Sequence, residues 1–247
     1  MRILSIGNSF SQDAHRYLYK IAKAMGSPMT LVNLYIGGCS LRTHYINMLE
    51  GREDYWLEFN GVPTGFRVSL ADALISQDFD VVTLQQASHF SAFPDTYFPY
   101  IEELADYVHT YCPRAKIYLH ETWAYADGSE KLRGVGFDVK EQMYDALHKA
   151  YLGAAERIGA YGIIPAGRAM LEAQHLGIEN IHRDTFHAAL GAGRLLLGLA
   201  WYHTLYGKDI SEVPEIELEA PVSDEEKDII IRAVNAASAD AGGWKWK

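Results

Sequence analysis

Short apolar runs rich in β-branched residues alternate along the chain with longer stretches whose apolar residues recur every three or four positions. Five of these runs are candidate strands: residues 3–6, 30–36, 79–84, 115–119 and 162–164. Because helical stretches separate most of them, the strands are expected to pair in parallel, with helices on both faces. The pattern predicts an α/β fold, a three-layer α/β/α sandwich with a mainly parallel central sheet.

The stretches between the strands predict the helices. Helical spacing covers residues 12–25, 40–49, 68–75, 97–111, 137–158, 167–175, 188–206 and 224–241. An aromatic segment has Asn60-Gly61 at its centre, a dipeptide typical of hairpin turns. We expect a small β-hairpin insertion there, at about residues 53–67, which either walls a pocket or forms a dimer contact. Residues 1–247 are predicted to form one domain with a flexible tail at 242–247.

Composition restricts the partners. The net charge of −10 and the pI near 5.4 disfavour nucleic acid and anionic membrane surfaces, which select basic patches, and favour a neutral or cationic ligand. The sequence shows no signal-peptide pattern and no apolar run of membrane-spanning length, so a cytoplasmic protein is expected. Two cysteines, Cys39 and Cys112, are too few for a disulfide framework, which agrees with a reducing compartment.

The first polar interruption, Gly7-Asn8-Ser9, lies between a predicted strand and a predicted helix. Ligands of open parallel sheets bind at this edge, and the free N–H groups of a helix start favour an anion or a developing oxyanion. Ser9 is therefore a candidate nucleophile. The alternative is that Asn8, Ser9 or Ser11 only caps the helix.

Two further predicted strands are followed by residues that could also take part in a site at this edge of the sheet. Gly37-Gly38 follows the second strand, where a glycine N–H makes a good oxyanion donor, although an ordinary turn also explains the pair. Gln85-Gln86 follows the third strand, where buried amides must either bond to backbone or face a site.

Asp184 and His187 lie three residues apart just before a long apolar helix. An aspartate at this spacing can orient a histidine that serves as a general base. Alternatively, Asp184 only caps the helix and His187 belongs to its first turn.

Taken in order, these four blocks resemble the SGNH (GDSL-type) hydrolase superfamily over nearly the whole chain. More closely, four segments resemble a bacterial branch of that superfamily catalogued as a domain of unknown function: Ile6-Gly-Asn-Ser-Phe-Ser11, Gly37-Gly-Cys-Ser-Leu41 with His44, Leu84-Gln-Gln-Ala-Ser88 and Thr122-Trp-Ala-Tyr125.

The resemblance implies a role for each matching residue. Ser9 matches the nucleophile, His187 the general base and Asp184 the residue that orients the imidazole. The backbone N–H groups of Ser9 and Gly38 match oxyanion donors. Two positions depart from the family pattern: Asn8 replaces the usual Asp, and Gln85-Gln86 stands where the family has Gly-x-Asn-Asp. Since a Gln amide donates the same hydrogen bond as Asn, one of the two, preferably Gln85, is expected to complete the oxyanion hole.

The remaining candidates are weaker. Trp123 is a candidate for stacking on a sugar ring or for a place in the core, and His44 is a second candidate substrate-binding residue. No metal and no cofactor are expected, because His44, His89, His120 and Glu121 lack a metal-ligand spacing such as HExxH. Cys39 is expected to be a small buried residue, since no adjacent His lowers its pKa.

The first hypothesis is a serine esterase that hydrolyses a small ester, most plausibly an O-acetyl group on a carbohydrate. The alternative is a non-catalytic module, or degenerate hydrolase, that binds a carbohydrate or a phosphate at Gly7 to Ser11. The absence of GxGxxG and Gly-Lys-Ser/Thr patterns argues against a nucleotide ligand. The sequence leaves the oligomeric state open.

Overall fold

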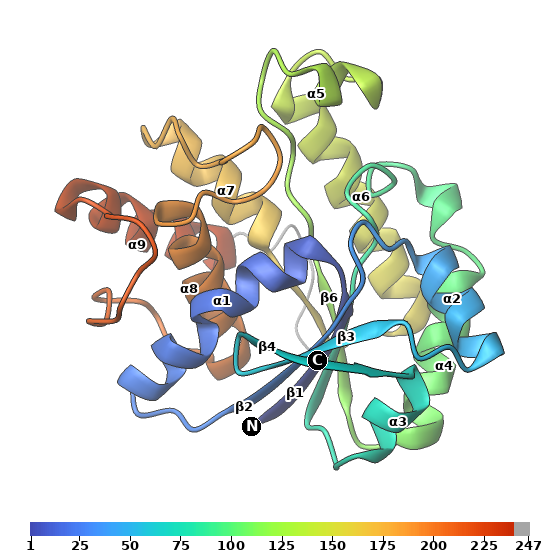
Figure 1. Cartoon of the computed structure of the whole chain (residues 1–247). Coiled ribbons are helices and arrows are strands. Elements are labelled where there is room, and N and C mark those ends of the chain that lie inside the picture. The colour runs from blue at the N-terminus through green and yellow to red at the C-terminus, as the bar shows by residue number, and fades with distance from the viewer. Residues whose placement is uncertain (240–247) are drawn as a thin grey trace.

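The computed structural model describes residues 1–239, and the strands of that part form one sheet in the order β4-β3-β2-β1-β5-β6-β7 (Figure 1). Strands β1, β2, β5, β6 and β7 pair in parallel, whereas β3 pairs antiparallel with both β2 and β4. The strand bounds are β1 (Arg2–Gly7), β2 (Thr30–Tyr35), β3 (Tyr55–Phe59), β4 (Val62–Val68), β5 (Val81–Leu84), β6 (Lys116–His120) and β7 (Gly162–Ile164). The predicted α/β fold class is confirmed.

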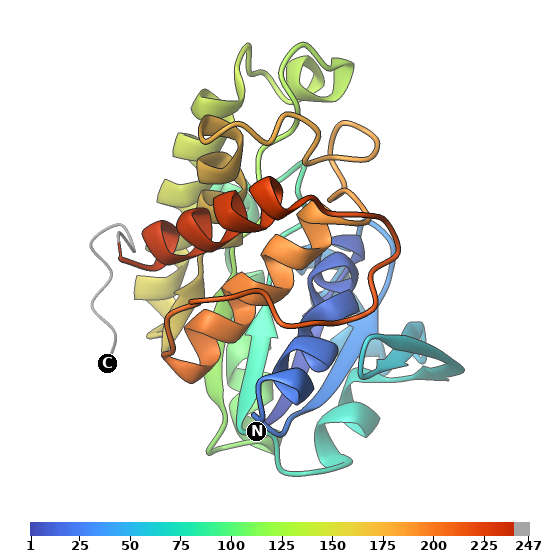
Figure 2. The same ribbon diagram turned by 90° about the vertical axis from the view of Figure 1, so that its left-hand side faces the viewer.

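Helices cover both faces of this sheet. Figures 1 and 2 show α1, α7, α8 and α9 on one face, and Figure 1 shows α2, α3, α4 and α6 on the other. The helices of the described chain are α1 (Ser9–Ala24), α2 (Leu41–Glu50), α3 (Leu70–Ile75), α4 (Tyr100–Tyr111), α5 (Glu130–Gly134), α6 (Lys140–Ile158), α7 (Ala166–His175), α8 (Ala192–Tyr206) and α9 (Asp224–Ala239), with a 3₁₀ turn at Pro94–Thr96. None of the helices within residues 1–239 combines the length and apolar character needed to cross a membrane.

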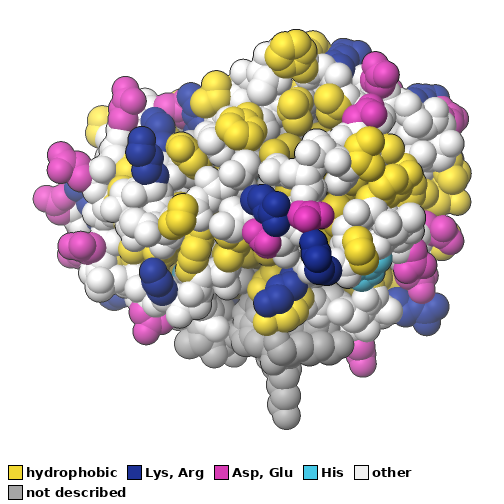
Figure 3. All heavy atoms as spheres, turned by 90° about the horizontal axis from the view of Figure 1, so that it is seen from below, with side chains coloured by type: hydrophobic (Ala, Val, Ile, Leu, Met, Phe, Trp, Pro, Cys, Tyr) yellow, Lys and Arg dark blue, Asp and Glu magenta, His cyan; other side chains and the backbone are white. Residues whose placement is uncertain are grey.

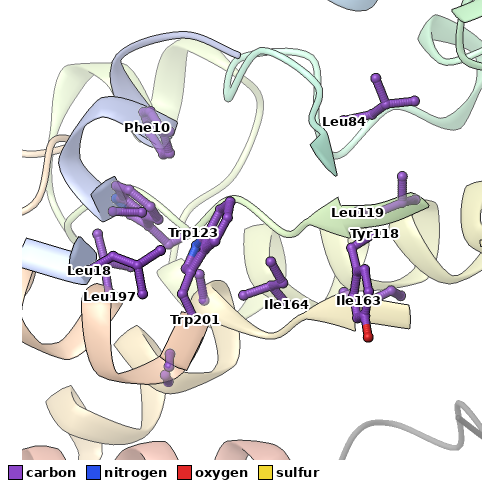
Figure 4. Close-up of a cluster of buried hydrophobic side chains, with 14 of the residues drawn as sticks. Phe10, Leu18, Leu84, Tyr118, Leu119, Trp123, Ile163, Ile164, Leu197 and Trp201 are labelled. Carbon is purple, nitrogen blue, oxygen red and sulfur yellow. The ribbon is translucent and has the colours of Figure 1, made fainter. Parts of the chain in front are cut away.

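The core lies between the sheet and each helical layer. Parallel strands are buried on both faces, so β1 and β5 are almost continuously apolar rather than alternating. Under the α1 and α8 layer, Leu18, Trp123 and Trp201 are fully buried in one cluster (Figure 4). This continuity is why the strands could be located from apolar runs alone.

Several helices begin at other residues than the periodicity predicts. Helix α1 begins at Ser9, three residues before the predicted start, because Asn8 caps it: the Asn8 side chain accepts a hydrogen bond from the Phe10 N–H at 3.0 Å. Helix α8 begins only at Ala192, four residues after the predicted start, because residues 182–188 form a loop closed by a bridge between His182 and Ala188.

Three other predicted starts, at residues 68, 97 and 137, are two or three residues too early, and Ser69 caps α3 at the first of them. Helix α5 was missed because its five residues are too few to show a period. The last two residues of the predicted 224–241 helix and the predicted tail at 242–247 lie outside the described residues.

The predicted hairpin exists, but it extends the sheet: β3 pairs with β2 and continues into β4 at the edge. Its turn residues Asn60 and Gly61 both have positive φ, 52° and 79°. A Cβ on Gly61 would lie 2.7 Å from the His15 carbonyl oxygen, so glycine also allows the turn to pack closely on α1.

Candidate active site

A pocket of about 460 Å³ lies where β1 and β2 end and α1 begins, at the carboxyl edge of the parallel strands. This edge is at the top of Figure 1, close to α5. Six parts of the chain line it: the start of α1 with its cap (Asn8, Ser9, Phe10 and Gln12), Tyr35 with Gly37-Gly38, Ser88-His89, Tyr125, Lys131, and the loop carrying Arg183, Phe186 and His187. The hairpin residues 55–66 do not line it, so of the two uses that the sequence left open for the hairpin, a wall of this pocket does not apply.

Three of the predicted residues meet at this pocket. The Ser9 hydroxyl lies 2.8 Å from His187 Nε2, although the two residues are 178 positions apart in the chain. On the other side of the ring, His187 Nδ1 lies 2.7 Å from Asp184 Oδ2. The His187 backbone N–H donates to Asp184 Oδ1 at 2.8 Å, which fixes the carboxylate in the plane it needs. Hydroxyl, imidazole and carboxylate therefore form one hydrogen-bonded chain.

The charge of Asp184 determines how this chain is protonated. Partial burial alone would raise the pKa of Asp184, but hydrogen bonds from the ring and backbone of His187 outweigh it and hold that pKa below its usual value. The carboxylate is thus ionised at neutral pH and is the acceptor for a proton on His187 Nδ1. That tautomer leaves Nε2 free to accept the proton of the Ser9 hydroxyl.

The loop that carries Asp184 and His187 is held in an unusual conformation. Thr185, a β-branched residue, has φ of 72°, which costs about 1 to 3 kcal/mol. Two hydrogen bonds hold the loop there: the Thr185 carbonyl accepts from Ala126 N–H at 2.8 Å, and the Phe186 carbonyl accepts from Trp123 Nε1 at 2.7 Å. The strained turn is what brings the Asp184 carboxylate back onto the imidazole three residues later.

Asp13 also holds this loop in place, although the sequence pattern did not indicate it as a site residue. Its carboxylate is fully buried on α1 and accepts hydrogen bonds from Arg183 at 2.8 and 2.9 Å and from Arg194 at 2.9 Å. It also accepts from the Ala188 N–H at 3.1 Å. One signal was available: Asp13 lies three residues after Phe10 and four before Tyr17, on the apolar face of its helix.

Backbone donors face the pocket next to Ser9. Ser9 is the first residue of α1, so its N–H has no acceptor within the helix. Gly38 lines the pocket with φ of 64°, and its N–H has no hydrogen-bond acceptor among the described residues. Asn8 ties the two loops together by donating from its side chain to the Cys39 carbonyl at 3.0 Å.

The expected amide donor is absent from the pocket, and this corrects the prediction for Gln85 and Gln86. The Gln85 amide donates to Asn8 Oδ1 at 2.7 Å, and its oxygen is 2.9 Å from His120 Nδ1. The Gln86 amide donates to the Thr96 carbonyl at 2.9 Å. Both side chains are buried and neither lines the pocket. Because both side chains are bonded within the interior and do not line the pocket, neither amide is placed to donate to an oxyanion there.

The residues after β5 that do line the pocket lie a few positions beyond Gln85 and Gln86 in the chain. Ser88 and His89 line it, and the Ser88 hydroxyl lies 2.9 Å from the Tyr125 hydroxyl, which lines it too. No role for Lys131 or Arg183 was predicted from the sequence, because nothing in their spacing indicates that their loops converge here. Ser88 and Tyr125 lie in the segments that carry the family resemblance, and His89 was considered only as a metal ligand.

The two predicted substrate contacts are wrong. Trp123 is completely buried, stacks on Phe10 with ring centroids 4.0 Å apart and donates to the Phe186 carbonyl. Figure 4 shows Phe10 and Trp123 in the same cluster of buried side chains. His44 is also completely buried, with Nδ1 3.0 Å from the Tyr55 hydroxyl. Neither side chain reaches the pocket, because both fill the interior behind it.

Cys39 is buried as expected, but a histidine does lie near it in space. His44 Nδ1 is 3.5 Å from Cys39 Sγ. Burial raises the pKa of Cys39 to about 12 and lowers the pKa of His44 to about 3, so both groups are neutral. This pair therefore provides no thiolate at neutral pH.

Comparisons with known proteins identify the family of this chain. The model of one family, "Domain of unknown function (DUF4886)", matches residues 2–237. The chain belongs to this DUF4886 family. A crystal structure of a DUF4886 family protein from Bacteroides uniformis is 29% identical, covers 100% of this chain and 97% of its own, and superposes with a TM-score of 0.91.

More distant structures share the fold of this DUF4886 protein. One from Slackia heliotrinireducens, described as a "putative SGNH hydrolase", has a TM-score of 0.61 at 23% identity and covers 83% of this chain and 98% of its own. The psychrotrophic esterase EstA from Pseudoalteromonas sp. has a TM-score of 0.55 at 13% identity and covers 83% of this chain and 97% of its own. The chain thus has the fold of SGNH hydrolases. A search of curated proteins found no match.

Proposed function

We propose that this DUF4886 protein is a serine esterase that hydrolyses a small ester, with O-acetyl groups on a carbohydrate as the substrate class. One observation carries the proposal: the hydrogen-bonded chain from Ser9 through His187 to Asp184, with the serine at a helix start in an open pocket. A module that only binds a ligand needs no imidazole oriented by an aspartate against a serine hydroxyl.

In the first half of the reaction, Ser9 Oγ attacks the ester carbonyl carbon while His187 Nε2 takes the hydroxyl proton. Asp184 stabilises the imidazolium that forms. The carbonyl oxygen becomes negatively charged and accepts hydrogen bonds from the N–H groups of Ser9 and Gly38, each contributing about 3 kcal/mol to the barrier reduction. The tetrahedral intermediate then collapses: the bond to the alcohol oxygen breaks, His187 returns the proton to that oxygen, and the acyl group stays on Ser9.

In the second half, water replaces the alcohol. His187 removes a proton from the water as its oxygen attacks the acyl carbon, and the same backbone donors bind the second oxyanion. Ser9 leaves with the proton from His187, and the carboxylic acid is released. We expect the Ser88 hydroxyl to be the third oxyanion donor, since it lines the pocket at the end of β5, where the sequence suggested an amide.

The pocket volume of about 460 Å³ suits a small ester on a larger alcohol such as a sugar. Trp123 gives no support to the carbohydrate, because it is buried. The aromatic side chains available to a sugar ring are instead Tyr35 and Phe186, which both line the pocket. The esterase EstA supports the proposal only through its shared fold.

The test is hydrolysis of p-nitrophenyl acetate near neutral pH with EDTA present, followed by acetate release from acetylated sugars. Ser9→Ala and His187→Ala should each lower kcat at least about 10³-fold, with thermal unfolding unchanged. Ser76→Ala, a substitution of an exposed serine that caps the far end of α3, should behave like the wild type. Turnover that survives in Ser9→Ala would refute the assignment of the nucleophile.

A further inference from the structure

The pocket has a charge opposite to that of the chain. The sequence carries a net charge of −10, yet the fixed charges lining the pocket are the cations Lys131 and Arg183. No Asp or Glu of residues 1–239 lines it. The Asp184 carboxylate does not line the pocket, and each of its oxygens accepts a hydrogen bond from His187. A ligand in this pocket therefore meets positive charge and no carboxylate.

The buried carboxylates behind the pocket wall do not change this. Asp13 accepts from Arg183, Arg194 and a backbone N–H, so the charge of Arg183 is largely compensated within the protein. Glu58 is 3% exposed and accepts hydrogen bonds from the amides of Gln12 and Asn33. Because Gln12 lines the pocket and Glu58 does not, the amide lies between that carboxylate and a ligand.

Lys131 is the cation that remains available. It lies on α5, above the strand ends in Figure 1, and none of the described carboxylates is within salt-bridge distance of its ammonium. The ammonium lies 4.2 Å from the ring centroid of Phe186, and that ring lies 3.9 Å from the ring of His187. One aromatic ring thus separates an unpaired cation from the proposed general base.

Neutral donors line the pocket beside Lys131. His89 lines the same pocket, and burial together with the nearby charge of Lys131 lowers the pKa of His89, so its ring is neutral at pH 7 and offers an N–H donor. The Tyr125 hydroxyl also lines the pocket, hydrogen-bonded to the Ser88 hydroxyl at 2.9 Å. An ammonium with neutral donors around it is suited to a carboxylate, which accepts from several donors at once.

We propose that the ester hydrolysed at Ser9 carries a carboxylate, on its acyl or its alcohol part, a few bonds from the scissile carbonyl, and that Lys131 binds this carboxylate. The inference rests on the proposed esterase function and narrows its substrate class. It also differs from the expectation that net charge alone gave, a neutral or cationic ligand. The reason is that a ligand responds to the few charges within a Debye length, about 8 Å at physiological ionic strength, more than to the sum over the chain.

The experiment compares matched esters with and without a carboxylate. On the acyl side the pair is mono(4-nitrophenyl) succinate and 4-nitrophenyl valerate. On the alcohol side the pair is 4-acetoxybenzoate and its methyl ester. For each pair the measured quantity is the ratio of kcat/KM for the charged ester to that for the neutral ester, in the wild type, Lys131→Met and the matched control Lys149→Met, which alters an exposed lysine of α6 outside the pocket.

We expect Lys131→Met to lower this ratio at least tenfold in one of the two pairs, mainly through KM for the charged ester, while Lys149→Met keeps the wild-type ratio. The pair that responds tells which side of the ester carries the carboxylate. Unchanged ratios in both pairs, with hydrolysis intact, would overturn the inference and leave the esterase function standing. Absence of hydrolysis of all four esters by the wild type would overturn both proposals.

Discussion

The two edges of the central sheet differ in how they use charge. At the amino edge, a pocket of about 320 Å³ is lined by Arg2, Asp80, Asp78 and Arg114, and its charges pair across the surface: Arg2 with Asp80 at 3.5 Å and Arg114 with Asp78 at 3.0 Å. Figure 3, which views the molecule from below, shows basic and acidic side chains lying next to one another on this side. Such exposed pairs contribute little and are screened by salt.

At the carboxyl edge, the charged groups differ from one another in burial and in their partners. Asp13 is buried under two arginines, Asp184 orients one imidazole, and Lys131 has no carboxylate partner among residues 1–239. Both pockets hold a few hundred Å³, about 320 Å³ at the amino edge and about 460 Å³ at the carboxyl edge, so either is large enough for a small ligand. In this fold, therefore, a functional site is recognised by polar groups that hydrogen bonds hold in position and by a charged group that lacks a partner.

The largest expected effect tests the oriented imidazole at the carboxyl edge. Asp184→Asn should lower kcat for p-nitrophenyl acetate about 10³- to 10⁴-fold, because an amide no longer holds the proton on His187 Nδ1. Urea unfolding should change little, since the Asp184 side chain is 45% exposed. Asp80→Asn at the amino edge is the matched control, and its kcat should equal that of the wild type. A loss of activity in both variants would contradict the contrast between the edges.

The next effect is on stability and compares two aspartates that pair with arginine. Asp13→Asn should lower the free energy of unfolding by about 3 kcal/mol, because it removes a buried charge from under Arg183 and Arg194. Asp80→Asn should lower it by less than about 1 kcal/mol, because its pair with Arg2 is exposed. Urea denaturation of the three proteins at pH 7 measures both values, and equal losses would refute the distinction.

Taken per residue, the smallest effect is that of acid on the buried histidines. Burial lowers the pKa of His15, His44 and His120 to about 3, and the charge of His120 contributes at His15. In the unfolded chain these histidines take up protons near pH 6.5, so the unfolded state binds more protons and stability falls as pH drops from there toward 3. At pH 5 each histidine should cost about 2 kcal/mol relative to pH 7.

Urea unfolding at pH 7 and pH 5 tests this, with His44→Gln expected to show a weaker pH dependence than the wild type. Asp80 at the amino edge contributes nothing in this window. Partial burial opposes the shift, but hydrogen bonds from Arg2 hold the pKa of Asp80 below its usual value, so its stabilisation is lost only at lower pH. A stability that does not change between pH 7 and pH 5 would contradict the prediction.

The alternation of strands and helices and the parallel sheet could be predicted from the sequence, because strands buried on both faces leave continuous apolar runs. The sequence also placed Ser9 at the junction of a strand and a helix, because the polar Gly7-Asn8-Ser9 interrupts two apolar patterns. The short separation of Asp184 and His187 indicated a pair within hydrogen-bonding reach. Each of these features depends on residues close together in the chain.

Which side chains reach the pocket could not be predicted from the sequence and is seen only in the tertiary structure. Gln85 and Trp123 follow strands at the carboxyl edge of the sheet, but their side chains lie in the interior. There they donate hydrogen bonds to Asn8 Oδ1 and to the Phe186 carbonyl. Lys131 reaches the pocket from a helix too short to leave a pattern, and Asp13 holds a loop that lies 170 residues away in the chain. The physical reason is that local spacing fixes backbone conformation, whereas the direction and partners of a side chain depend on packing between segments that are distant in sequence.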